Sequence, residues 1–213
     1  MNKRSAKNLI AMIGVIAGFS LTACGRKLDW TQDAPLHDAR TLVVERRSEF
    51  GSSFPGNSGL EIGQTLTFRH PDTGERITWR IPEGLQPVMI DFDRGVPYYV
   101  LTEYTVADYN QWGCPNPPYL VYRYEQGKWM RIAFEALPEP FLNRNLLEMS
   151  KEIRGLKDGG HVSAYGLENH WNGYPKTMNI RQISRKKINP IVKGCWESTL
   201  HKQGRQSEID NRR

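Results

Sequence analysis

One group of histidines and carboxylates in this chain is close enough in sequence to share a site. His161, Glu168 and His170 stand in a glycine-rich stretch, and Asp158 precedes them. A histidine titrates near neutral pH, so it can exchange protons with a substrate held beside a carboxylate. Zinc sites instead need short histidine spacings and further ligands, which this stretch lacks. The group is compatible with acid–base chemistry, although a polar surface loop is the simpler interpretation.

A second pair of carboxylates is Asp91 and Asp93, with Gly95 two residues further on. This spacing matches a fragment of a calcium loop. Calcium takes about six to eight oxygen ligands, however, and Arg94 stands where another oxygen would be needed. We interpret the pair as part of an aspartate–glycine turn and expect neither a metal nor another cofactor. Asp91 and Asp93 stay candidates for a hydrolase active site.

Tyrosines gather in the middle of the chain, where seven of the nine lie between positions 98 and 124. Aromatic side chains dominate binding surfaces, but they also suit buried strands, and adjacent strand residues face opposite sides. Both interpretations stay open, with core packing favoured. The sharper candidates for binding are Tyr109 and Trp112, in a proline-stiffened loop over residues 108–118. A rigid loop loses little entropy when it binds a partner.

The amino terminus has the pattern of an export signal. Lys3, Arg4 and Lys7 precede an uncharged run over residues 9–23. As a helix these 15 residues reach only about 22 Å, short of the roughly 30 Å hydrocarbon core of a bilayer. The run is therefore typical of a signal peptide rather than a membrane span. It ends in Leu21-Thr22-Ala23-Cys24, which resembles the lipobox of bacterial lipoproteins.

This resemblance implies that residues 1–23 are a lipoprotein signal peptide and that Cys24 carries the lipid that anchors the mature protein. Each buried methylene of an acyl chain adds about 0.8 kcal/mol to membrane binding. Gly25 follows the cysteine, where an aspartate in that family often means retention at the inner membrane. In a Gram-negative host the expected location is the outer membrane, facing the periplasm. An ordinary secretory signal is the alternative.

Two cysteines, Cys114 and Cys195, are left in the mature chain. In an oxidising cell envelope they are predicted to form a disulfide, worth roughly 4 kcal/mol for a loop of about 80 residues. Loss of the signal lowers the formal charge from +6 to +3, and nucleic acid is not an expected partner of an exported protein. Basic residues over 176–205 would attract anionic lipids, although a solvated surface is the default interpretation.

After the signal peptide, the sequence is predicted to divide into a tether, one domain and a tail. Residues 24–40 are polar without a period and are predicted to form a tether. Residues 41–200 should form a single β-rich domain, and residues 201–213 a flexible tail. Residues 87–100 and 112–124 look similar to uncharacterised exported bacterial proteins, a resemblance that implies no activity.

Turn signals separate the predicted strands into hairpins. The turns at residues 71–74, 93–95 and 125–127 each join two runs rich in apolar and β-branched residues. Three hairpins in succession favour an antiparallel meander over a parallel α/β sheet, because neighbouring strands satisfy one another's backbone groups locally.

One helix is predicted, because Leu142, Leu146, Met149 and Ile153 form one apolar stripe at helical spacing. It should cover one face of the sheet, whereas residues 157–173 are expected to form a loop. The predicted fold class is mainly β (α+β), with an antiparallel meander sheet or partial barrel and one covering helix.

These features predict a lipid-anchored protein of the cell envelope that acts as a non-catalytic binding or structural module. Its expected partners are the membrane, through the lipid, and an envelope protein, a glycan or an anionic lipid. The first alternative is an envelope hydrolase that uses Asp91, Asp93 or the group of His161, Glu168 and His170. The second is an immunity or inhibitor lipoprotein whose aromatic loop plugs an enzyme.

Overall fold

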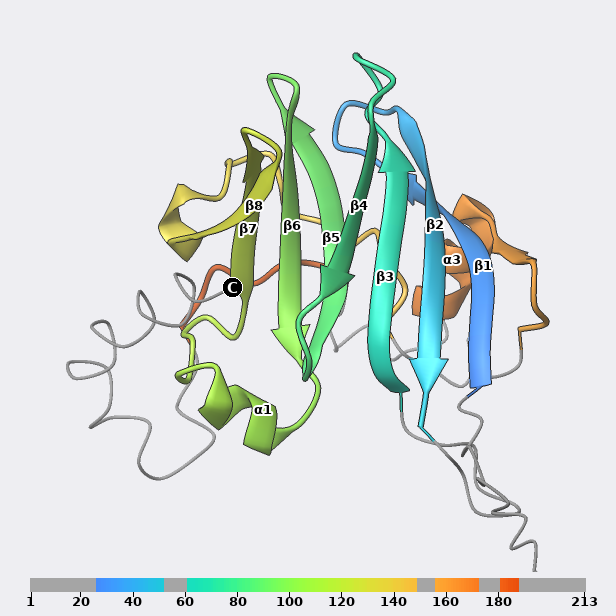
Figure 1. The fold of residues 1–213 in the computed structure, drawn as a ribbon. Helices are drawn as coiled ribbons and strands as arrows, with labels where there is room; N and C mark the ends of the chain where they lie inside the picture. The colour runs from blue at the N-terminus through green and yellow to red at the C-terminus, as the bar shows by residue number, and fades with distance from the viewer. Residues whose placement is uncertain (1–25, 52–60, 149–155, 173–180, 188–213) are drawn as a thin grey trace, which may run out of the picture.

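The computed structural model describes residues 26–51, 61–148, 156–172 and 181–187, and of residues 171 and 172 it describes the backbone alone. Two sheets make up this part of the chain (Figure 1). Sheet A has the order β4-β3-β2-β1-β9, and sheet B has the order β5-β6-β7-β8. All neighbouring strands are antiparallel except β9, which runs parallel to β1. The predicted mainly β fold with antiparallel meanders is confirmed.

The elements follow the order of the chain. The strands of sheet A are β1 (Arg26–Pro35), β2 (Thr41–Phe50), β3 (Glu61–Arg69), β4 (Arg76–Ile81) and β9 (Gly160–Val162). Those of sheet B are β5 (Leu85–Asp93), β6 (Val96–Glu103), β7 (Leu120–Glu125) and β8 (Lys128–Ile132). The helices are α1 (Val106–Gln111), a 3₁₀ turn (Phe134–Ala136) and α3 (Ala164–Asn172).

The three predicted hairpin turns are confirmed. Arg94 and Gly95 have φ angles of 49° and 76°, and Gln126 and Gly127 have φ angles of 51° and 79°. Two successive residues with positive φ form the tight turn whose twist matches that of paired strands. Gly74, with a φ of 73°, ends the turn between β3 and β4. These positions depend on local backbone preferences, which is why sequence alone identifies them.

The predicted tether is wrong for residues 26–35, which form strand β1 between β2 and β9. Leu28, Trp30 and Ala34 point inward and are buried. Gln32, which shares their face, is fully buried as well. A glutamine at an inward position interrupts the apolar alternation that marks a strand, so the sequence pattern concealed β1.

The helix predicted from Leu142 onward is wrong over residues 142–148, because this segment is not helical. The rest of the predicted apolar stripe, at positions 149 and 153, lies outside the described residues. Leu146 and Leu147 are adjacent, yet each is buried in a different hydrophobic cluster. The covering helix is α3, in the stretch expected to be a loop, and it lies behind β1 and β2 (Figure 1). Its Leu167 packs with Leu28 and Trp30.

Sheet B is buried on both faces along β5, where every residue from Leu85 to Phe92 is buried, whereas β8 is largely exposed. One face packs on sheet A, where the rings of Trp79 and Trp129 stack with centroids 5.0 Å apart. The other face packs on Leu137, Phe141 and Ile183 from the segments that follow β8. β5 is therefore covered on both faces although it is an edge strand of sheet B.

The outer face of sheet A carries ion pairs that join different strands, either neighbouring ones or β2 and β4 across β3. Examples are Arg47 with Asp29 at 2.6 Å, and Arg76 with Glu45 at 2.6 Å. Both side chains of each pair are about half exposed, and exposed pairs of this kind contribute about 0–1 kcal/mol. This face is therefore a solvated surface whose charges add little to stability.

His70 is expected to be a structural histidine whose replacement by alanine lowers the free energy of unfolding by about 2 kcal/mol. Its buried ring accepts the N–H groups of Asp72 and Thr73 at Nδ1, and its Nε2 donates to the carbonyl of Gly95 at 2.7 Å. The ring thus joins two hairpin turns. Chemical denaturation measures the free energy of unfolding of His70→Ala and of the control Arg69→Ala, whose side chain is exposed. Equal stability of the two variants would contradict the structural role of His70.

Candidate functional site

A pocket of about 470 Å³ lies where four parts of the chain meet. Its walls are the loop between β1 and β2, the strand β5, residues 140–145, and α3 together with Arg181. Ligand sites are commonly concave and have a few polar groups fixed among apolar ones. The apolar lining here includes Leu36, Pro140 and Leu142, and the polar lining includes His37 and Asp91.

His37 and Asp91 form the most strongly fixed polar pair of the pocket. Asp91 is 4% exposed and holds His37 twice, through Oδ1 to Nδ1 at 2.8 Å and through Oδ2 to the backbone N–H at 3.0 Å. Asp91 Oδ1 also accepts the N–H of Phe92 at 2.8 Å. Because the carboxylate oxygens act as acceptors, Nδ1 carries the hydrogen of the neutral ring, and Nε2 is left as an acceptor.

The turn between β1 and β2 presents this histidine. The N–H of Leu36 donates to the carbonyl of Arg40 at 2.8 Å, and Ala39 takes a φ of 68° to close the turn. The edge of the His37 ring packs against Phe141, with the ring centroids 5.1 Å apart. A backbone bond, a side-chain bond and a ring contact therefore fix one orientation of the imidazole.

Asn145 fastens the pocket wall formed by residues 140–145 to β5 and β1. Its Nδ2 donates to the carbonyls of Ile90 at 2.7 Å and Pro35 at 2.9 Å, and its Oδ1 accepts the N–H of Ile90 at 2.9 Å. The carbonyl of Val88, at a bulge in β5, accepts the N–H groups of Asn145 and Leu146. The side-chain amide thus pairs with the edge of β5 as a neighbouring strand would.

Arg46 binds the same segment at Leu147. One guanidinium nitrogen donates to Gln32 Oε1 at 2.9 Å and to the carbonyl of Leu147 at 2.6 Å, and the other donates to Gln64 Oε1 at 2.6 Å. The guanidinium also lies 4.4 Å from the ring centroid of Trp30. Burial lowers the pKa of Arg46 to about 10, so the side chain stays charged at neutral pH.

The remaining charged groups of the pocket are arranged in pairs. Glu168 Oε1 accepts from Arg181 at 3.2 Å. Arg144 is paired with Glu148 and also donates to the hydroxyl of Tyr119 at 3.1 Å. Glu168, Arg181 and Arg144 therefore each have an opposite charge beside them, whereas Asp91 accepts the N–H groups of His37 and Phe92.

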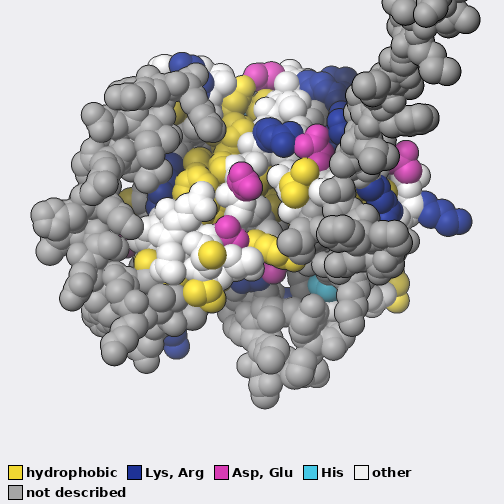
Figure 2. Space-filling view, turned by 60° about the horizontal axis from the view of Figure 1, so that its bottom comes forward, with side chains coloured by type: hydrophobic (Ala, Val, Ile, Leu, Met, Phe, Trp, Pro, Cys, Tyr) yellow, Lys and Arg dark blue, Asp and Glu magenta, His cyan; other side chains and the backbone are white. Residues whose placement is uncertain are grey.

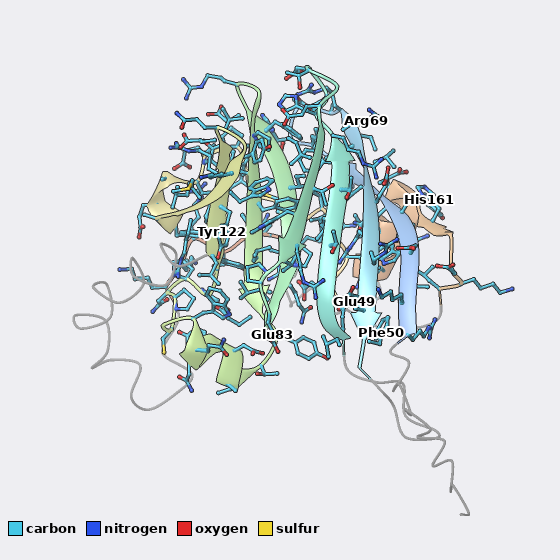
Figure 3. The ribbon with its side chains drawn as sticks, in the orientation of Figure 1. Glu49, Phe50, Arg69, Glu83, Tyr122 and His161 are labelled. Atoms are coloured by element: carbon cyan, nitrogen blue, oxygen red, sulfur yellow. The ribbon has the colours of Figure 1, made fainter. Side chains whose placement is uncertain are left out.

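The acid–base group predicted from the sequence does not converge. His161 Nδ1 lies 2.8 Å from the hydroxyl of Thr31, at the β9 edge of sheet A (Figure 3), whereas Glu168 pairs with Arg181 in the pocket. His170 lies on α3. Among the described residues no three His, Cys, Asp or Glu side chains are grouped to hold a metal ion.

The two predicted carboxylates have different surroundings. Asp91 is the buried partner of His37, whereas Asp93 pairs with Arg94 at the hairpin turn. The sequence prediction missed His37, because it falls among residues assigned to a tether. Its position in a short turn between two strands, one residue before an aspartate, was the available signal.

The predicted display of Tyr109 on a binding loop is wrong. Tyr109 is 4% exposed, and the half-buried Trp112 packs against the main core while its Nε1 donates to the carbonyl of Glu83 at 3.3 Å. Tyr98, Tyr99, Tyr119 and Tyr122 are buried too, which confirms the favoured interpretation of core packing.

The structure does not test the predictions for the cysteines. Cys24 and Cys195 lie outside the described residues, so lipid attachment and the disulfide with Cys114 stay predictions. No helix within the described segments is long and apolar enough to cross a bilayer. Comparisons of the chain with protein-family models, with curated proteins and with solved structures found no match.

Proposed function

We propose that this chain is a lipid-anchored protein of the bacterial cell envelope that binds a small ligand in the pocket around His37. The lipobox at residues 21–24 supports the anchor and the compartment. The observation that carries the binding function is the histidine itself. Its ring is fixed by Asp91 and Phe141 at a concave site, where a free Nε2 can contact a ligand.

Preorganisation favours binding. His37 and Asp91 are already held by hydrogen bonds, and Glu168 and Arg181 by an ion pair, so these side chains lose little rotamer freedom when a ligand enters. The buried Tyr109 offers no plug for a target enzyme, which weakens the inhibitor alternative. A hydrolase remains the second candidate, because a histidine oriented by an aspartate can accept a proton from water at Nε2.

The anchor is tested by Cys24→Ala. Without the thiol no acyl chain is attached, so this variant is expected to lose the detergent-soluble lipidated form that the unchanged chain gives. Fractionation and intact-mass measurement of both proteins report the difference. Cys114→Ala is the matched control and should keep the lipid mass. An unmodified Cys24 in the unchanged protein would contradict the lipid anchor.

The pocket is tested by photo-crosslinking in the envelope from position 165. Tyr165 lines the pocket and is 73% exposed, so a photoreactive residue there can reach a bound molecule without disturbing the core. The control position is Val43, which is 53% exposed on β2 and does not line the pocket. We expect an adduct from position 165 that position 43 does not give. The same products from both positions, or none, would contradict a ligand site here.

A further inference from the structure

We propose that the ligand of the pocket is a neutral saccharide, an inference that rests on the binding function proposed above. The argument uses three properties of the pocket wall. These are its charged side chains, each already bonded to a partner, its exposed aromatic ring, and the acceptor that Asp91 leaves on His37.

The charge balance favours a ligand without net charge. The Asp91 carboxylate already accepts three N–H groups, two from His37 and one from Phe92, and Glu168 pairs with Arg181. The third charged lining residue, Arg144, is paired with Glu148. An anion at either arginine would lie beside the carboxylate that already pairs with it, and a cation at Glu168 would lie beside Arg181, so each would meet a like charge. A neutral ligand leaves every pair in place and can still form hydrogen bonds with the pocket's polar side chains.

An aromatic ring stands beside the pocket on α3. Tyr165 is 73% exposed although it is large and aromatic, and Leu142 on the opposite segment is 45% exposed. A sugar ring has an apolar C–H face that packs on an aromatic ring and a rim of hydroxyls that seek polar partners. Tyr165 can supply the packing surface that such a ligand needs, in the same pocket as the polar groups.

His37 and Asn143 supply complementary hydrogen-bonding groups. Nε2 of His37 is an acceptor in the neutral ring, and the exposed amide of Asn143 offers both a donor and an acceptor. A hydroxyl both donates and accepts, so it can serve either group. A purely apolar ligand would instead remove these groups from water without a bond, at about 1–3 kcal/mol for each group.

The experiment uses saturation-transfer NMR on the full chain, purified in a detergent without a sugar headgroup. The probes are N-acetylglucosamine and its disaccharide, both neutral, with glucosamine as the cationic analogue and glucuronate as the anionic one. We expect saturation of the neutral sugars, strongest on the ring protons of one face. Both charged analogues should bind more weakly, because each would meet a like charge beside the group with which it would pair.

Matched variants assign the signal to the pocket. Tyr165→Ala is expected to weaken binding of the neutral sugars by about threefold to tenfold, whereas Tyr165→Phe keeps the ring and should keep the affinity. Tyr104→Ala removes another exposed tyrosine, on a different part of the chain, and should have no effect. Because Tyr165 is largely exposed, its loss leaves the core intact.

The outcomes separate this inference from the proposed function. Tighter binding of a charged analogue, or sugar binding that Tyr165→Ala leaves unchanged, would overturn the neutral saccharide. Absence of any sugar signal would overturn it as well. In each of these cases a specific crosslink from position 165 would still support a pocket ligand of another class. Absence of both the sugar signal and the crosslink would remove both proposals.

Discussion

Replacing Asn145 with alanine is expected to lower the free energy of unfolding by about 4 kcal/mol. The substitution removes three hydrogen bonds at once, of which the two to Ile90 are buried and the one to Pro35 is partly buried. It leaves the N–H and the carbonyl of Ile90 and the carbonyl of Pro35 without this partner. Each buried backbone group left unsatisfied costs about 1–3 kcal/mol, and water has little access because Asn145 is 3% exposed.

Urea denaturation and thermal melting measure this loss, which should appear as a fall of roughly 10 °C in Tm. Asn143→Ala is the matched control, because Asn143 lies two residues away on the same segment but is exposed; it should stay within about 0.5 kcal/mol of the unchanged protein. Asn145→Asp should be no milder than the alanine variant, because a carboxylate oxygen would face two carbonyls. A stable aspartate variant would contradict the account of this network.

Arg46→Ala is expected to cost about 3–4 kcal/mol, by removing the donor shared by Gln32, Gln64 and the carbonyl of Leu147. It also removes the guanidinium that covers the ring of Trp30. The loss should extend to the pocket, because Leu147 and Asn145 belong to one segment and Gln32 also donates to the carbonyl of Asn145 at 3.0 Å. Weaker ligand binding and lower stability are therefore expected together.

The neighbouring arginine provides the control for this prediction. Arg47 lies on the opposite face of β2, and its pair with Asp29 is half exposed, so Arg47→Ala should cost about 0–1 kcal/mol. Arg46→Met keeps much of the buried volume but none of the donors, and it should recover part of the loss. A methionine variant more stable than the unchanged protein would mean that desolvation of the charge outweighs the hydrogen bonds.

The hairpins could be predicted from the sequence because their signals are local. Gly74, Gly95 and Gly127 mark turns through backbone preference, and alternating apolar residues mark the strands on either side. The class of fold followed from these local signals, since successive hairpins form a meander without further information.

The pocket could not be predicted in the same way, because its parts meet through contacts between distant residues. His37 and Asp91 are 54 positions apart, and Gln32 and Asn145 are 113 apart. The inward Gln32 looked like a surface residue, because nothing in its own neighbourhood reveals the arginine and the asparagine that satisfy it. α3 was missed for a related reason: only tertiary packing shows that Leu167 is buried.

The position of β1 has a consequence for how the protein would stand on a membrane. β1 begins at Arg26, two residues after Cys24, and two residues of extended chain span at most about 7 Å. An acyl group on Cys24 would therefore hold the end of sheet A at the lipid headgroups, with no stalk to lift it away. α1 lies at the same end of the molecule, where acidic, basic and apolar side chains are interspersed (Figures 1 and 2). In that arrangement the pocket, whose wall includes Pro35 at the other end of β1, would lie away from the lipid headgroups.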